Sequence, residues 1–193
     1  YYQFRWHESR IPAAGSYLSN ADIIGEGSES WILGPGVAML HMDDLEPDDQ
    51  GQFGLQMRYT LDSVGIDLGL YAARYHAKTP TASYNYFPTM TYRWVYAQDI
   101  ETYGVSATGS LGQLNWATEL SYRRNAPLNS DPQEDVGLTG GNDEDDRLYA
   151  VGETVHANLS GIYVLKPTFL WNGGAVVAEL AYNTQLDVTD NED

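Results

Sequence analysis

Six charged residues fall on the polar sides of segments that alternate apolar and polar residues, and these six are the main candidates for chemistry. They are Arg5, Arg58, Asp67, Glu119, Arg123 and Glu179. An ionised group is costly to bury against lipid, so we expect them to be hydrated or paired. One interpretation is a charged constriction that selects or orients a solute. The other, which we favour, is a cross-strand ladder of arginines and carboxylates that fills and stiffens an interior.

The sequence contains little that indicates catalysis or metal binding. The four histidines, His7, His41, His76 and His156, are scattered and lack metal-ligand spacing. The chain has no G-x-S-x-G, phosphate-loop or H-E-x-x-H motif, and nothing in it places a nucleophile beside a base. The sequence therefore predicts that the protein is not an enzyme and uses no cofactor.

The acidic run GGNDEDD, residues 140–146, is the one candidate for a cation site. Asp143, Glu144, Asp145 and Asp146 supply oxygen atoms of the kind that bind Ca²⁺. Their spacing does not match an EF-hand loop, so we expect solvated surface loops rather than a metal centre. A cation that bridges these acids to anionic lipopolysaccharide is the alternative.

Residues 51–70 show most clearly which elements must position these side chains. Apolar residues occupy every second position, which places one apolar and one polar face on a β-strand. The apolar positions are Phe53, Leu55, Met57, Tyr59 and Leu61, then Val64, Ile66, Leu68 and Leu70. Asp62 and Ser63 lie between the two series and favour a tight turn. Each arm holds about ten residues, which at about 3.4 Å per residue and a tilt near 45° crosses the hydrocarbon core of a bilayer.

The same pattern recurs along the chain and predicts about seven strands. They are expected near residues 1–8, 51–61, 64–76, 100–111, 114–124, 155–165 and 175–184. The connections alternate between long segments (9–50, 77–99, 125–154) and short turns. That alternation is typical of a membrane barrel with tight periplasmic turns and large external loops. We therefore expect an all-β fold, an antiparallel transmembrane β-barrel with long acidic external loops.

Charge and composition narrow the classes of function. The net charge of −17 argues against nucleic acid as a partner. Sixteen of the 27 acidic residues fall in segments expected to be loops, at 43–49, 131–146 and 187–193, and the 15 tyrosines suit interfacial belts. No apolar run approaches the roughly 18 residues of a membrane helix, which excludes a helical inner-membrane protein but not a barrel.

Three segments also resemble a known family. They are AGSY (14–17), residues 100–111, and ELSYRRNAP (119–127). They resemble a large Gram-negative outer-membrane family of unknown function, whose barrels are similar to long-chain fatty-acid porins. Arg124 departs from the motif, where proline is common. The resemblance covers only part of the family's usual length. Bacterial barrels usually have an even number of strands, whereas about seven are expected here. On both grounds we expect a fragment of a longer barrel.

The resemblance implies an outer-membrane location and a channel or transporter for small hydrophobic solutes, in contact with outer-membrane lipid and lipopolysaccharide. It supplies no ligand and no catalytic residue. Two alternatives remain open. One is a structural or surface-interaction barrel with a plugged lumen. The other is a soluble β-sandwich binding module, which would be favoured if the apolar faces met in a dry centre between two stacked sheets.

Overall fold

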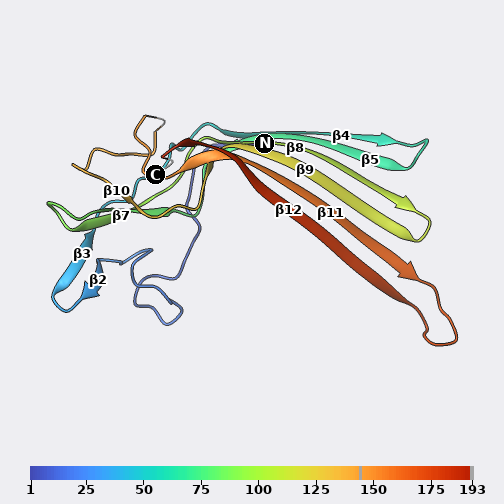
Figure 1. Cartoon of the computed structure of the whole chain (residues 1–193), viewed down its shortest axis with the longest axis horizontal. Coiled ribbons are helices and arrows are strands. Elements are labelled where there is room, and N and C mark those ends of the chain that lie inside the picture. Colours follow the sequence, from blue (N-terminus) through green and yellow to red (C-terminus); the bar gives the residue numbers. More distant parts are fainter. Residues whose placement is uncertain (144, 192–193) are drawn as a thin grey trace.

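The computed structural model describes residues 1–143 and 145–191, and within them it contains β-strands and no α-helix. The all-β class expected from the sequence is therefore confirmed. In this part of the chain, no helix is long and apolar enough to cross a membrane. The strands form two sheets, one of seven strands and one of five (Figure 1).

The seven-stranded sheet is antiparallel throughout and has the order β1-β4-β5-β8-β9-β11-β12. Its strands are β1 (Tyr2–Gln3), β4 (Gln52–Leu61), β5 (Ile66–Tyr75), β8 (Ile100–Leu111), β9 (Leu114–Pro127), β11 (Val151–Leu165) and β12 (Gly174–Asp190). The strand directions rotate progressively from β4 to β12, as the inherent twist of β-strands requires (Figure 1). Short turns join the strands at one end, and all long connections lie at the other end.

Several strand boundaries differ from the expected ones: β11 begins at Val151 rather than near residue 155, for example, and β9 ends at Pro127 rather than near residue 124. The first strand was expected over residues 1–8, but β1 holds only two residues. The second arm was expected from Val64, but it begins at Ile66, because residues 62–65 form the turn. Gly65 closes that turn with a φ of 65°, a conformation that glycine adopts without steric cost. The last strand continues past residue 184, so that Asp187 and Asp190 lie in β12 rather than in a loop.

Neither sheet closes into a barrel within the described residues. On one side of the larger sheet, β1 pairs only with Gln52 and Phe53 of β4. On the other side, β12 pairs with β11 alone. Each edge therefore leaves a long row of backbone donors and acceptors without a strand partner, which is the condition under which sheets recruit further strands.

The five-stranded sheet was not expected, because all of its strands lie in segments that the sequence pattern assigned to loops. Its order is β10-β6-β7-β3-β2. The strands are β2 (Ser30–Gly34), β3 (Val37–His41), β6 (Thr81–Asn85), β7 (Thr91–Val95) and β10 (Gln133–Glu134). Two of the pairings, β3 with β7 and β10 with β6, are parallel and join segments far apart in the chain. The long connections thus fold together into one layer, which we call the loop layer (Figure 1).

The buried core lies in the loop layer and at its junction with the larger sheet. Val95 and Val151 are fully buried, and Met39, Tyr92 and Tyr149 are nearly so. Trp6, just after β1, is also buried, and its indole N–H donates a 3.0 Å hydrogen bond to the carbonyl of Ala77. This core fixes the loop layer against the ends of β5, β8 and β11, where the candidate site is found.

Candidate functional site

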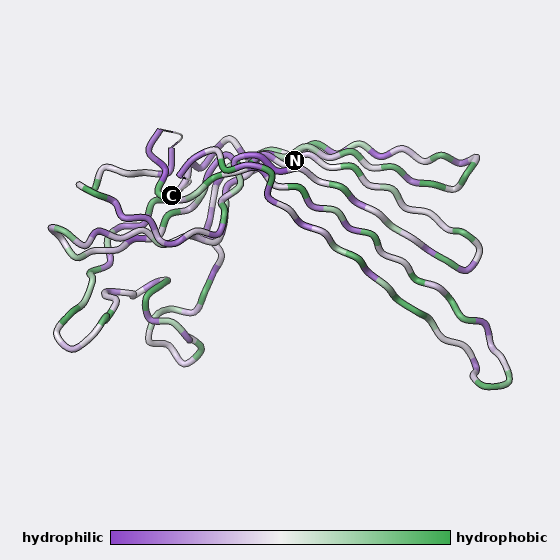
Figure 2. The backbone as a smooth tube through the Cα atoms, in the orientation of Figure 1, coloured by the Kyte–Doolittle hydropathy of each residue, from purple (hydrophilic) through white to green (hydrophobic). Residues whose placement is uncertain are grey.

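The strand register gives the seven-stranded sheet one apolar face and one polar face. Residues paired across neighbouring strands share a face, so each register row can be read from β4 to β12. One row consists of Met57, Leu70, Val105, Leu120, Ala157 and Tyr182. The next row along, on the other face, consists of Arg58, Gly69, Ser106, Glu119, Asn158 and Ala181. Figure 2 shows the resulting alternation of hydrophobic and hydrophilic residues along the strands.

The apolar face is exposed rather than packed against another layer. Leu55 in β4 is 74% exposed, Leu159 in β11 is 51% exposed and Leu180 in β12 is 68% exposed. Ile66 and Trp116 are half-buried. These side chains therefore do not meet in a dry centre between two stacked sheets. The face is an apolar surface that the described residues leave uncovered.

Five of the six charged candidates lie on the polar face. Arg58 and Glu119 share one register row, Asp67 and Glu179 share the next, and Arg123 lies nearer the loop layer. Arg5 is separate. It follows β1 and lines a different pocket, of about 390 Å³, together with acidic residues that include Glu8 and Asp49.

The expected ladder of arginines and carboxylates does not form among these residues. The arginine–carboxylate ion pairs within the described residues lie elsewhere, at Arg74–Asp99 and Arg93–Asp135, and the imidazole of His41 lies 2.9 Å from the carboxylate of Asp44. Neutral neighbours bind two of the carboxylates instead. The hydroxyl of Thr60 donates to Asp67 at 2.6 Å, and the amide of Asn158 donates to Glu179 at 2.6 Å. The polar face is thus mainly an amide and hydroxyl surface with charges spaced along it.

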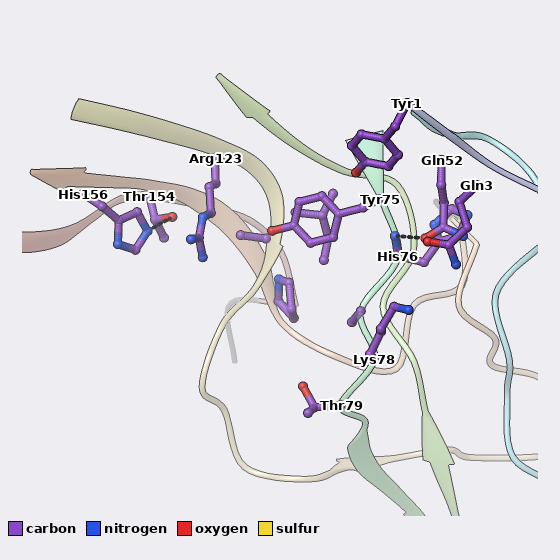
Figure 3. A pocket seen from close by; sticks show the side chains of 14 residues that line it. Tyr1, Gln3, Gln52, Tyr75, His76, Lys78, Thr79, Arg123, Thr154 and His156 are labelled. Atoms are coloured by element: carbon purple, nitrogen blue, oxygen red, sulfur yellow. Dashed lines mark hydrogen bonds between the residues drawn. The ribbon is translucent and has the colours of Figure 1, made fainter. Parts of the chain in front are cut away.

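A pocket of about 540 Å³ lies at the end of this polar face, where the sheet meets the loop layer. Arg123 of β9 lines it together with His156 and Thr154 of β11 (Figure 3). Gln3, Gln52 and His76 lie on the opposite side, and Lys78 and Thr79 come from the connection after β5. Tyr75 and Ile100, which are paired across β5 and β8, lie between the two sides.

The two histidines of this pocket have both ring nitrogens engaged. Nδ1 of His76 accepts from the backbone N–H of Asp99 at 3.0 Å, so Nε2 carries the proton that it shares with the carbonyl of Gln50 at 3.0 Å. His156 lies between Asn183 (2.8 Å) and Thr154 (3.0 Å). Both rings therefore fix neighbouring strands and loops rather than point free donors into the pocket.

Arg123 and Gln52 have donors without acceptors. The side chain of Arg123 makes no hydrogen bond or ion pair with another described residue, and its Nε is buried. Gln52 is 1% exposed, and its Oε1 accepts from the backbone N–H of His76 at 3.1 Å, whereas its Nε2 has no partner. The Thr102 hydroxyl, on the strand position opposite Arg123, is also buried without a partner among the described residues.

The loop layer has its own electrostatics. Asp135, which the sequence placed in a solvated acidic loop, is only 3% exposed. It accepts from the guanidinium of Arg93 and from the backbone N–H groups of Thr139 (3.1 Å) and Gly140 (2.9 Å). Burial, helped by a 2.8 Å hydrogen bond to Glu8, raises the pKa of Tyr96 well above its ordinary value. Burial also raises the pKa of Tyr92 and of Tyr149.

The residues proposed for Ca²⁺ are not arranged as a metal site. Across residues 1–143 and 145–191, no three histidine, aspartate or glutamate side chains cluster so as to hold a metal ion. The Asp146 carboxylate instead accepts from the backbone N–H of Asp143 at 3.2 Å, which closes a local turn. Glu144, the fourth residue of that set, lies outside the described residues.

Of the six charged candidates expected from the sequence, only Arg123 lines this pocket. Gln52, Tyr75 and His156 lie on the polar side of their strands, but the alternation that places them there gives no sign that they converge. Lys78 lies in a connection without any period. The one feature of the sequence that pointed to this pocket was an arginine, Arg123, on the polar face of a strand and close to its end.

These features define a class of all-β protein in which an antiparallel sheet with one apolar and one polar face extends from a folded layer of loops. The chain belongs to a protein family of unknown function, DUF1302, whose family model matches residues 1–193. No curated protein and no solved structure matches the chain. Membership agrees with the unknown-function family inferred from the sequence, and the likeness to long-chain fatty-acid porins stays a prediction.

Proposed function

We propose that the seven-stranded sheet is part of the wall of an outer-membrane β-barrel that conducts small, mainly hydrophobic solutes. The observation that carries the proposal is the broad, exposed apolar face of the seven-stranded sheet. A soluble protein rarely leaves so extensive an apolar surface in water. In a bilayer, the same face would contact lipid, and the polar face would line a hydrated interior.

The height of the apolar band suits a membrane. It extends over five register rows, from the row of Leu55 and Tyr103 to the row of Leu111 and Tyr163. Four steps of two residues span about 27 Å along the strands, or about 21 Å across a bilayer at a tilt of about 40°. Outer-membrane barrels carry an apolar band about 25 Å tall. Beyond the band, Arg74, Glu101 and Arg124 form a charged row on the loop side.

The free edges also favour a barrel over an isolated sheet. A membrane leaves no water to hydrogen-bond the outer edges of β4 and β12, so both edges need further strands. Bacterial barrels usually have an even number of strands, and seven is odd. In this proposal the polar face and the 540 Å³ pocket lie on the path of the solute, with the loop layer at its external mouth.

A single-cysteine scan of β9 tests the orientation directly. The chain contains no cysteine, so each introduced thiol can carry one spin label. Labels at 118, 120 and 122, on the apolar face, should be accessible to oxygen dissolved in lipid and shielded from a water-soluble nickel chelate. Labels at 115, 117 and 119, on the polar face, should show the reverse. Tyr17→Cys, in a fully exposed position of the loop layer, provides the aqueous reference.

The orientation proposal fails if the accessibilities at 119 and 120, both exposed and on opposite faces, do not differ. Conduction is measured separately, by the swelling of vesicles that contain the full-length protein. Permeation of small solutes supports a channel, and impermeable vesicles with the alternating label pattern point to a plugged barrel.

A plugged, surface-interaction barrel is the second candidate, favoured by the folding of the long connections into a sheet with its own core. Loops that served only as solvated linkers would not need Val95, Tyr92 and Tyr149 buried beneath them. On this reading, deletion of residues 131–146 should abolish partner binding and leave solute uptake unchanged. Loss of uptake would favour the channel instead.

A further inference from the structure

The pocket at the end of the polar face has the opposite charge from the rest of the chain. Its lining includes the cationic residues Arg123 and Lys78 and contains no aspartate or glutamate. The whole chain carries a net charge of −17. A cationic pocket in such a chain attracts and holds negative charge locally, whereas the acidic surface elsewhere repels it.

Two of the residues that line the pocket have hydrogen-bond donors without an acceptor. Arg123 has no acceptor among the described residues, and neither does Nε2 of the buried Gln52. A buried donor without an acceptor costs free energy, more so when it is charged. The histidines do not contribute, because His76 and His156 already have both ring nitrogens engaged. The guanidinium of Arg123, which lines the pocket, is therefore complementary to a ligand that accepts hydrogen bonds and carries negative charge, whereas Nε2 of Gln52 is buried out of a ligand's reach.

The space between these groups is apolar. Arg123 and Gln52 lie on β9 and β4, with β5 and β8 between them. At about 4.8 Å per strand, their backbones are about 14 Å apart across the sheet. The ring of Tyr75 and the buried side chain of Ile100 occupy this interval, and Ala126 borders it. An inorganic anion would use the guanidinium and leave this surface without contact.

We propose that this pocket binds a small organic anion, a carboxylate with an apolar body, through the guanidinium of Arg123. The carboxylate accepts the paired N–H groups of Arg123, with Lys78 adding charge from the rim. The body lies over Tyr75 and Ile100. The inference rests on the proposed function, since it makes such anions a solute class captured at the mouth of the barrel.

The test compares three probes on the detergent-solubilised full chain by isothermal titration calorimetry. Benzoate has both the charge and the apolar body, benzamide has the same shape without the charge, and acetate has the charge without the ring. Benzoate should bind at least about tenfold more tightly than either of the others, because charge-assisted hydrogen bonds are among the strongest polar contacts.

Variants locate the site. Arg123→Gln should raise the dissociation constant of benzoate by about 10- to 100-fold and remove the preference over benzamide. Arg123→Lys, which keeps the charge, should retain part of the affinity. The matched control is Arg124→Gln, which removes the same charge from the next residue, on the opposite face, and should leave binding unchanged.

Equal affinity for benzoate and benzamide would overturn the proposal, as would unchanged benzoate binding by Arg123→Gln. Near-UV circular dichroism tests whether each variant is folded. If Arg123→Gln does not fold, the benzoate affinity of Arg123→Lys is compared with that of the parent protein instead. Because binding is measured in detergent, it is independent of orientation in lipid. Alternating spin-label accessibility without benzoate binding refutes the anion site alone, and benzoate binding without that alternation refutes the membrane proposal alone.

Discussion

Leu159→Arg is the substitution that best separates a membrane wall from a water-exposed sheet. Leu159 lies near the middle of the apolar band, with Thr118 and Leu180 opposite it on β9 and β12. At the midplane of a bilayer an arginine on the lipid face of a barrel costs about 2–4 kcal/mol. In water the same change at a side chain that is 51% exposed should stay within about 0.5 kcal/mol. The two environments therefore predict clearly different losses.

The measurement is guanidinium unfolding of the protein inserted in phosphatidylcholine vesicles. Ser160→Arg is the matched control, because it places the same charge one residue further on, on the polar face and opposite Glu179. It should be neutral or slightly stabilising. Leu111→Arg, near the turns at the end of the band, should cost only about 0–1 kcal/mol, since the penalty falls with distance from the midplane.

The reasoning is refuted if Leu159→Arg and Ser160→Arg have the same unfolding free energy, or if the cost at Leu111 equals that at Leu159. The first result would mean that the apolar face does not contact hydrocarbon, and the second that Leu159 does not lie nearer the midplane than Leu111.

Two further predictions concern the loop layer. Asp135→Asn should destabilise that layer by about 3–5 kcal/mol, because it leaves the Arg93 guanidinium buried without its counter-charge. Limited proteolysis within residues 128–147 should then be faster than in the parent protein. The control Asp131→Asn, at an exposed position, should be cleaved at the parent rate. Equal cleavage rates for the two variants would contradict the structural role of the buried Asp135. The raised pKa of Tyr96 predicts that the protein loses stability at alkaline pH. Below about pH 10 the phenol is protonated in both the folded and the unfolded chain. Above that pH the phenol ionises first in the unfolded chain, so the free energy of unfolding falls as the pH rises. Tyr96→Phe should flatten that fall in tryptophan fluorescence measured from pH 9 to 12, and an unchanged slope would show that Tyr96 is not its source.

The sequence determined the strands of the larger sheet because alternation is a local property. Phe53, Leu55 and Met57 must share a face wherever their strand lies. Positions that break the alternation also kept their faces. Ile162 and Val164 fall on the polar side in the sequence, and the register places them there, opposite Asn115 of β9 and Ala175 of β12 respectively. Turn residues were less certain, since Val64 fits the apolar period and yet lies in the turn.

The tertiary structure alone decided the loop layer and the pocket. Strands of five residues such as β3 and β7 are too short to show a period, and their parallel pairing joins residues 40–41 to residues 91–92. Asp135 has the composition of a solvated loop, and only the fold brings Arg93 to it. Arg123 was visible as a charge on a polar face, but its lack of a partner depends on what β4, β5, β8 and β11 bring beside it. The alternation of a strand is fixed by its own residues, whereas convergence on a pocket depends on the register between strands.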